Sequence, residues 1–162
     1  MLILGIDPGL KGGLVALQGT EVVLKAVMPV AKLTKTKKII DRNKLARLIE
    51  DLNPDHTCVE QIIAMPRQSA QSGTTTGIGW GVIVGILAAL KLRNSDVSSK
   101  TWQTAMFRDR PKDDTKALAA LVCSNLWPRE NWIVSLKTGK PDEGLCDAEL
   151  IAEYTRRTNG AA

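Results

Sequence analysis

Residues 2–9 read Leu2-Ile3-Leu4-Gly5-Ile6-Asp7-Pro8-Gly9, an apolar run that ends in an aspartate followed by a turn signal. The apolar run predicts a first strand. Because Pro8-Gly9 forces the backbone to turn, we expect the Asp7 carboxylate to project at the edge of a sheet. The alternative is an aspartate that only caps the turn, since Asp before Pro-Gly is a common turn opening.

The segments downstream of this strand alternate between strand and helix patterns. Two more strands, at 14–17 and 22–27, complete a predicted meander with glycine in both turns. The remaining segments are a helix at 42–52, a strand at 57–62, a polar loop at 65–76, a glycine-rich helix at 78–90, a strand at 95–97 and helices at 101–107, 113–126 and 142–154. This order predicts an α/β sheet with an antiparallel start and later parallel crossovers, in one domain spanning 1–162.

Composition narrows the classes of function. Lys and Arg outnumber Asp and Glu by 22 to 17, a net charge of +5 that suits a polyanionic partner without requiring one. The three cysteines, Cys58, Cys123 and Cys146, lie far apart among apolar residues, as buried free thiols do. With no signal-peptide pattern and no apolar stretch of the ~20 residues that span a membrane, we expect a cytoplasmic protein with no membrane association.

Four acids are candidates for a shared site. Glu60 lies in a strand expected to be buried, where an unpaired carboxylate is costly, so either a salt bridge or a metal ion should compensate it. Glu143 and Asp147 are four residues apart and share one helical face, although solvated acids in a first turn would show the same spacing. Asp142 suits a helix cap, but a shift of one residue in the helix start would exchange its role with that of Glu143.

The chemistry of this set points to a hard divalent cation. The ligands offer only oxygen, with no cysteine or histidine cluster, which favours Mg²⁺ or Mn²⁺ over Zn²⁺. Two such ions a few ångströms apart can activate water and stabilise the leaving oxygen of a phosphodiester. The acid set therefore predicts a metal-dependent nuclease.

At these residues the chain resembles the RuvC family of Holliday-junction resolvases, and it is more similar to the small phage and organelle-type branch than to the standard bacterial enzymes. The resemblance runs nearly end to end. Its anchors are Gly5-Ile6-Asp7-Pro8-Gly9, Val59-Glu60-Gln61, Thr75-Thr76-Gly77, Lys100-Thr101-Trp102, Gly144-Leu145-Cys146-Asp147-Ala148 and Leu150-Ile151-Ala152-Glu153-Tyr154.

The resemblance implies an RNase H-like fold, with a five-stranded mixed sheet flanked by helices. It implies a homodimeric endonuclease that makes paired nicks in four-way or other branched DNA, in a prokaryotic cell or a phage-infected host. Two Mg²⁺ ions per active site, replaceable by Mn²⁺, would be bound by Asp7, Glu60, Glu143 and Asp147. Lys112 resembles a catalytic lysine that approaches the scissile phosphate.

Two departures from the family pattern bear on activity. The first acid of the last helix is usually aspartate, whereas this chain has Glu143 preceded by Asp142, so either residue is a candidate ligand. Gln103 stands where relatives of this branch often carry lysine after the tryptophan. Lys100 and Lys116 are candidate phosphate contacts in its place, and surface lysines without a role are the alternative.

Further DNA contacts are expected from a basic segment and from the region after Glu60. The basic segment holds Lys32, Lys35, Lys37 and Lys38, followed by Arg42 and Lys44, and a merely solvated loop is its alternative. In the family the region after Glu60 lies near the branch point, so Arg67 is a candidate phosphate contact and Met65 a candidate wedge beside unstacked bases. Thr74 and Thr75 complete the expected DNA-contacting set.

Glycines at positions 77, 81 and 85 place a smooth stripe on one helix face, where another backbone can approach closely. We expect Gly77, Gly81 and Gly85 to form the dimer interface, with packing onto the sheet as the alternative. The tryptophans Trp102, Trp127 and Trp132 are scattered, and we interpret them as packing residues.

Two rival functions remain from the sequence. One is a catalytically weakened protein that binds branched DNA, suggested by the Asp142-Glu143 pair and Gln103. The other takes Gly5-Ile6-Asp7-Pro8-Gly9 as the phosphate motif of actin-like ATPases. Chain length argues against the second, because those folds need two related domains and no second phosphate loop is present.

Overall fold

A single mixed sheet organises the part of the chain that the computed structural model describes, namely residues 1–62, 70–108, 114–134 and 139–159, with the side chains of 70–72 excluded. Its strand order is β3-β2-β1-β6-β7. The strands are β1 (Leu2–Ile6), β2 (Gly13–Gln18), β3 (Glu21–Val27), β6 (His56–Gln61) and β7 (Asn94–Ser98). The first three form an antiparallel meander, whereas β6 and β7 run parallel to β1. The predicted five-stranded sheet with an antiparallel start is confirmed.

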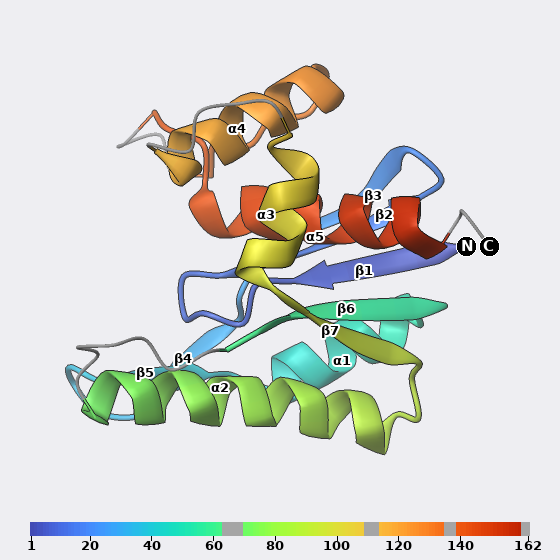
Figure 1. Ribbon diagram of the computed structural model, residues 1–162. Helices are drawn as coiled ribbons and strands as arrows, with labels where there is room; N and C mark the ends of the chain where they lie inside the picture. Colours follow the sequence, from blue (N-terminus) through green and yellow to red (C-terminus); the bar gives the residue numbers. More distant parts are fainter. Residues whose placement is uncertain (63–69, 109–113, 135–138, 160–162) are drawn as a thin grey trace.

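Helices cover both faces of the sheet (Figure 1). They are α1 (Arg42–Leu52) and α2 (Ala70–Ala89) on one face, and α3 (Ser99–Met106), α4 (Thr115–Leu126) and α5 (Glu143–Asn159) on the other. Each face has its own apolar core, because side chains alternate along a strand. In β1, for example, Ile3 belongs to the core beneath α3, α4 and α5, whereas Leu4 and Ile6 belong to the core beneath α1 and α2.

Local sequence accounts for the ends of the first helix. Asp41 caps α1, because its carboxylate accepts a hydrogen bond from the Lys44 N–H at 3.1 Å. Asn53 ends the helix in the left-handed conformation, with φ of 45°. Leu45 and Ile49 between them are fully buried, at the helical spacing that the sequence shows.

The basic segment contains a hairpin that the sequence did not predict. Its strands, β4 (Val30–Lys32) and β5 (Lys38–Ile40), pair antiparallel and form a separate two-stranded sheet. Ile40 is buried against the core beneath α1 and α2. Each strand is only three residues long, and apolar–polar alternation over so few residues cannot be distinguished from a loop. The hairpin is therefore recognised from the packing of Ile40 and not from the sequence pattern.

The expected polar loop at 65–76 is wrong over its second half, because α2 begins at Ala70. Its threonines are weak helix formers, but the first turns of α2 pack beside β5, and tertiary packing outweighs propensity. The glycine-rich helix predicted at 78–90 lies within α2 and is buried on one side only. Gly79, Ile83 and Leu87 are buried, whereas Gly77, Gly81 and Gly85 on the other side are exposed.

Backbone atoms of α5 pack closely against the strands below it. A Cβ added to Gly5 of β1 would lie 2.1 Å from the Ala148 carbonyl oxygen and 2.6 Å from the Ala152 amide nitrogen. At the start of α5, Gly12 and Gly144 form a β-bridge, and a Cβ on Gly144 would lie 2.3 Å from the Lys11 carbonyl oxygen. Glycine at these positions lets the first turns of α5 lie directly on the end of the meander.

This contact gives a stability prediction. Gly5→Ala should lower the free energy of unfolding by roughly 3 kcal/mol, because the new methyl group meets the backbone of α5 and cannot be relieved by a side-chain rotation. Urea unfolding measures the change. Gly9→Ala is the matched control, since a Cβ there meets nothing nearer than 3.5 Å. Equal stability of the two variants would contradict the close packing of α5 on β1.

Candidate active site

Strand alternation and strand order bring two of the predicted acids together. Asp7 follows directly after β1, and Glu60 lies near the end of the neighbouring parallel strand β6. The register pairs Ile6 with Val59, so Asp7 and Glu60 come next on adjacent strands. Both side chains lie on the face of the sheet that α5 covers, because each is an even number of residues from Ile3 or Cys58, which pack beneath that helix.

Asp147 completes this group from above the sheet. Its pKa is raised to about 8, mostly by burial and further by the negative charges of Asp7, Glu60 and Glu143. The positive charge of Lys116 acts in the opposite direction. The structure therefore places the other three predicted acids within electrostatic reach of Asp147, at the end of the sheet where β1 ends and α5 begins.

Asp7 and Glu60 resemble Asp147, because burial raises the pKa of each and neither forms an ion pair among the described residues. Burial raises the pKa of Asp7, partly offset by a hydrogen bond of 3.2 Å from the Gly9 N–H to Oδ1. Burial also raises the pKa of Glu60, whose Oε1 accepts a hydrogen bond of 3.1 Å from the Trp102 indole N–H. Among the described residues Glu60 has no ion pair, so the salt-bridge alternative for this carboxylate finds no support there.

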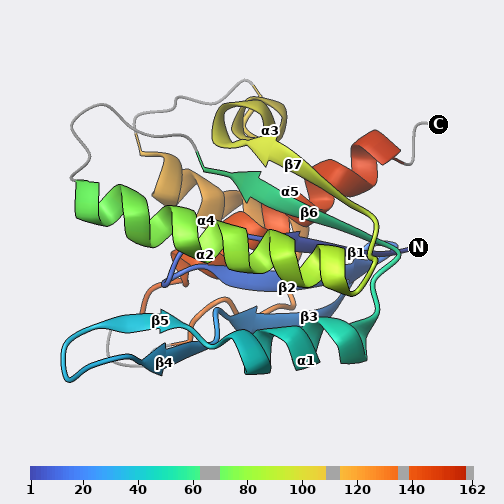
Figure 2. The same cartoon turned by 90° about the horizontal axis from the view of Figure 1, so that it is seen from below.

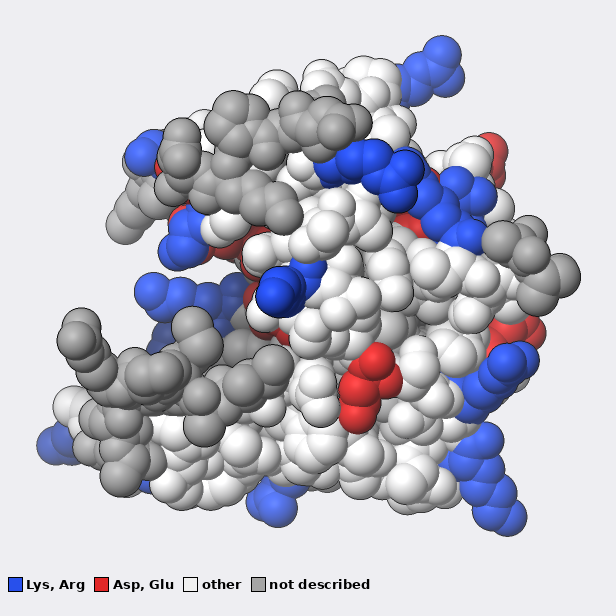
Figure 3. Space-filling view, viewed as in Figure 1, with Lys and Arg blue, Asp and Glu red and all other residues white. Residues whose placement is uncertain are grey.

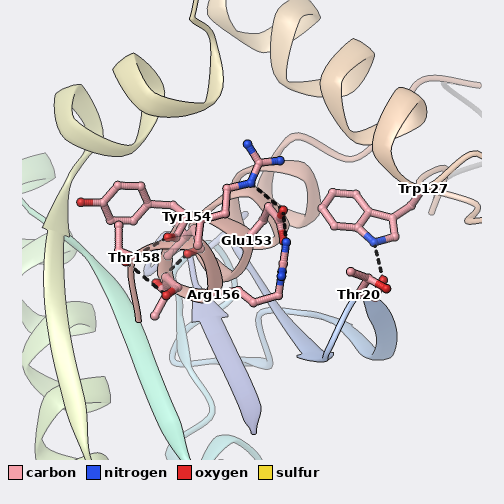
Figure 4. Close-up of polar contacts among 9 residues, drawn as sticks. Thr20, Trp127, Glu153, Tyr154, Arg156 and Thr158 are labelled. Atoms are coloured by element: carbon pink, nitrogen blue, oxygen red, sulfur yellow. Dashed lines mark hydrogen bonds and ion pairs between the residues drawn. The ribbon is translucent and has the colours of Figure 1, made fainter. Parts of the chain in front are cut away.

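Glu153, two turns further along α5, shows what a structural buried acid looks like in this chain (Figure 4). Its carboxylate is only 3% exposed, and it accepts hydrogen bonds from Arg156 Nε at 2.6 Å and Arg157 Nε at 2.7 Å. These two arginines lower its pKa despite burial. Asp7, Glu60 and Asp147 form no such ion pair with an arginine or lysine within the described ranges, which distinguishes them from Glu153.

The ambiguous pair at the start of α5 divides into two different roles. Asp142 caps the helix, because its Oδ1 accepts a hydrogen bond from the Leu145 N–H at 3.0 Å. This confirms the capping prediction for Asp142, although its charge is also near enough to raise the pKa of Asp7. Glu143 is exposed and forms an ion pair of 2.6 Å with Lys116 of α4.

The carboxylate oxygens of this site are the kind of ligand that a hard divalent cation prefers, but they do not converge on one point. Within 1–62, 70–108, 114–134 and 139–159, no three His, Cys, Asp or Glu side chains converge closely enough to hold a metal ion. Carboxylates of like charge repel one another, and Glu143 is turned toward Lys116. Carboxylate oxygens match the ligand preference of Mg²⁺ and Mn²⁺. The raised pKa values of Asp7, Glu60 and Asp147 show that the protein compensates their negative charge only in part.

Basic residues surround this acidic centre. Figure 3 shows acidic side chains in a hollow on the left of the molecule, with basic side chains on either side of it. Lys32, Lys35, Lys37 and Lys38 are exposed on the hairpin β4–β5, and Lys100 is exposed in the first turn of α3. Lys116 pairs with Glu143, a contact that the sequence did not indicate. Met65, Arg67 and Lys112 lie outside the described residues.

The remaining candidates lie on α2 and in the core. Thr74 and Thr75 line a cleft beside the hairpin. Gly77, Gly81 and Gly85 are exposed, and a Cβ at each would meet open space, so packing onto the sheet does not explain this stripe. The tryptophans Trp102, Trp127 and Trp132 are buried, as predicted. The sequence missed the second role of Trp102, which orients Glu60 through its indole N–H.

Comparison with solved structures identifies the fold. RuvC from Thermus thermophilus in complex with a Holliday-junction substrate matches with a TM-score of 0.68 and 15% identity, covering 98% of this chain and 96% of that chain. The chain has the RuvC fold. A second Thermus thermophilus RuvC structure matches with a TM-score of 0.65 and 16% identity, over 98% of this chain and 97% of the other.

The RuvC fold also relates the chain to the yeast mitochondrial Holliday-junction resolvase Ydc2, with a TM-score of 0.61 and 15% identity. That match covers 98% of this chain and 80% of the yeast chain. The sequence itself matches no protein-family model and no curated protein. In the described part of the chain, no helix combines the length and apolar character needed to cross a membrane.

The crowding of negative charge gives a prediction for the metal-free protein. Because the folded pKa of Asp147 is about 8 against 3.8 for the free group, the unfolded chain loses this proton at lower pH than the folded chain. Asp147 therefore destabilises the fold increasingly as pH rises between these values. Asp147→Asn should raise the free energy of unfolding by roughly 1–3 kcal/mol at pH 7.

Urea unfolding in EDTA across pH 4 to 8.5 measures this effect, with Asp51→Asn, an exposed acid of α1, as the control. The gain in Asp147→Asn should shrink to roughly 0.5 kcal/mol near pH 4, where the folded state holds the proton and the unfolded state has lost it from only about half of its molecules. A gain that is independent of pH would show that charge repulsion is not its cause.

Proposed function

We propose that this chain is a structure-selective DNA endonuclease that resolves four-way or other branched DNA by paired phosphodiester hydrolysis. The observation that carries the proposal is the group of partly buried carboxylates, Asp7, Glu60 and Asp147, whose charges repel one another and which form no ion pair among the described residues. This group lies at the end of the central strands of a RuvC fold. The solved relatives with this fold are Holliday-junction resolvases, one of them bound to its junction.

In this proposal Asp7, Glu60, Glu143 and Asp147 hold two Mg²⁺ ions, and Mn²⁺ can replace them. Bound ions supply Lewis-acid stabilisation of the phosphate and a nucleophilic water. Trp102 orients Glu60 through its indole N–H, and the Gly9 N–H orients Asp7. Glu143 would bind metal in competition with its ion pair to Lys116, and that lysine would then be available to contact a phosphate.

The DNA path runs over the basic residues around the acidic centre. Lys32, Lys35, Lys37 and Lys38 on the hairpin and Lys100 on α3 offer phosphate contacts, each adding salt dependence to binding. Arg67 as a further phosphate contact and Lys112 as a catalytic lysine remain part of the proposal. Cleavage of two strands at a symmetric junction calls for two active sites, so we propose a homodimer through Gly77, Gly81 and Gly85.

A second candidate function is a protein that binds branched DNA and cuts it weakly. The observation that favours it is the ion pair between Glu143 and Lys116, since this pair competes with metal binding for the carboxylate. Glutamate at position 143, which is one methylene longer than the aspartate usual in the family, also favours this second function. We propose the protein acts in the cytoplasm, where the buried free thiols Cys58, Cys123 and Cys146 stay reduced.

Cleavage of a labelled four-way junction in Mg²⁺ tests the proposed activity. The parent chain should nick the junction and leave a duplex of the same sequence intact. Asp7→Asn should lower the rate more than about 100-fold, because it removes a metal ligand. Asp51→Asn is the control of equal charge change. Absence of cleavage by the parent chain in both Mg²⁺ and Mn²⁺, with tight binding retained, would favour the second candidate.

Isosteric variants separate the two acids at the start of α5. Asp142→Asn keeps a side chain that caps helices well, so we expect cleavage within about threefold of the parent. Glu143→Gln should lower cleavage more than about 30-fold and weaken Mn²⁺ binding, because a neutral amide replaces a ligand. Calorimetric titration of Mn²⁺ provides the second readout. The reverse order of effects would assign the metal to Asp142, and faster cleavage by Glu143→Asp would identify glutamate as the limiting feature.

A further inference from the structure

A cleft of about 390 Å³ lies between α2 and the hairpin β4–β5, on the face of the sheet opposite α5. Figure 2 shows both elements from this side of the molecule. Leu33 and Ile39 of the hairpin form one wall, and Ile78 and Val82 of α2 form the other. The volume falls within the range of roughly 300–1,000 Å³ typical of sites that enclose small organic groups.

The walls of this cleft expose apolar surface that the fold does not bury. The exposed fraction of Ile78 is 62%, and that of Leu33 is 55%. These are two of the most exposed large apolar residues in the described ranges, and they face the same cavity from two different elements. Apolar side chains gathered in this way mark a binding surface more often than isolated ones do.

The charges of the cleft are of one sign. Lys37 and Arg42 line it, and none of the described residues that line it is acidic. An apolar cavity flanked by cations is complementary to a group that is flat and uncharged but attached to an anionic chain. A nucleotide has this character, because its base is apolar on both faces while its phosphates are negative.

The cleft also adjoins the turn that carries Asp7. Leu10, three residues after Asp7, lines it, and so does Gly79 of α2. A Cβ added to Gly79 would lie 3.5 Å from the Pro8 carbonyl oxygen, so the helix wall of the cleft packs against the Asp7-Pro8 turn. A group held in the cleft would therefore lie beside the turn that follows β1, on the other face of the sheet from the Asp7 carboxylate.

We propose that the cleft between α2 and the hairpin binds an unpaired nucleobase of the branched DNA, with Lys37 and Arg42 on its flanking phosphates. This proposal rests on the proposed function and adds to it a means of selecting branched over regular duplex DNA. Bases at a branch point leave the stack at lower cost than paired bases. A continuous duplex offers no such base, so the cleft contributes affinity only to branched substrates.

A second copy of the chain is the main competing occupant. The glycine stripe proposed for the dimer borders the cleft on α2, because Gly81 and Gly85 follow the cleft residues Ile78 and Val82 by three positions, which places each about 60° around the helix from them. The basic rim, however, repels an identical basic rim and attracts the phosphates of DNA. This charge favours DNA over self-association in the cleft.

Junctions carrying 2-aminopurine at each branch-point position test the proposal in EDTA, so that no cleavage is needed. Emission of this base rises when it leaves the stack. We expect the parent chain to raise it several-fold for at least one position. Leu33→Ser and Ile78→Ser, one on each wall, should abolish most of the rise and weaken junction binding roughly tenfold, with duplex affinity unchanged. Val23→Ser and Leu121→Ser, exposed apolar residues on β3 and α4, are the matched controls.

Three results would overturn the proposal. The first is an unchanged emission rise and affinity in both cleft variants. The second is sedimentation showing that either variant dissociates a dimer, which would make the cleft a self-association surface. The third is junction cleavage by the parent chain with no emission change at any branch position, which would reject the base site while sustaining the proposed nuclease. Failure of the parent chain to bind any branched DNA would reject both.

Discussion

The direct contact of α5 with β1 is the constraint on which the rest of the molecule depends. It exists because Gly5, Gly12 and Gly144 leave no side chain between the backbones. The same contact sets the height of Asp147 above the sheet, where its charge meets those of Asp7 and Glu60. A larger residue at Gly5 or Gly144 would separate the helix from the segments beneath it and the acids from one another, and a larger residue at Gly12 would meet the Asp7 carbonyl oxygen. The packing of α5 on the sheet and the grouping of the acids around Asp147 therefore both depend on the close contact between α5 and β1.

The two halves of α5 treat buried charge in opposite ways. At Glu153, two arginines compensate the carboxylate, lower its pKa and close a local network. At Asp147, burial and the charges of neighbouring acids both raise the pKa, and the positive charge of Lys116 offsets this rise only in part. Glu149, between the two, is completely buried, and burial with the nearby charge of Glu153 raises its pKa to about 9, so it is neutral at pH 7. The fold thus compensates the carboxyl group of Glu153 by pairing and that of Glu149 by protonation, whereas Asp147 forms no ion pair among the described residues.

Much of this arrangement follows from local pattern. The apolar run of residues 2–6, the turn at Pro8-Gly9 and the buried strand around Glu60 were predictable, because strand periodicity and turn chemistry are properties of short segments. The spacing of Glu143 and Asp147 and the capping role of Asp142 also follow from helix geometry. The hairpin β4–β5 and the first turns of α2 were not predictable, because their stability comes from contact with each other and not from their own propensities.

The sequence by itself determined the order of elements, the acids at the ends of two strands and the first turn of the last helix, and the resemblance to the resolvases. Only the tertiary structure decided which partner each polar group has: the Trp102 indole for Glu60, Lys116 for Glu143 and two arginines for Glu153. It alone also created the apolar cleft between α2 and the hairpin. The reason is physical. Local conformation is set by neighbours in the chain, whereas charge compensation and cavity shape are set by segments that meet only after folding.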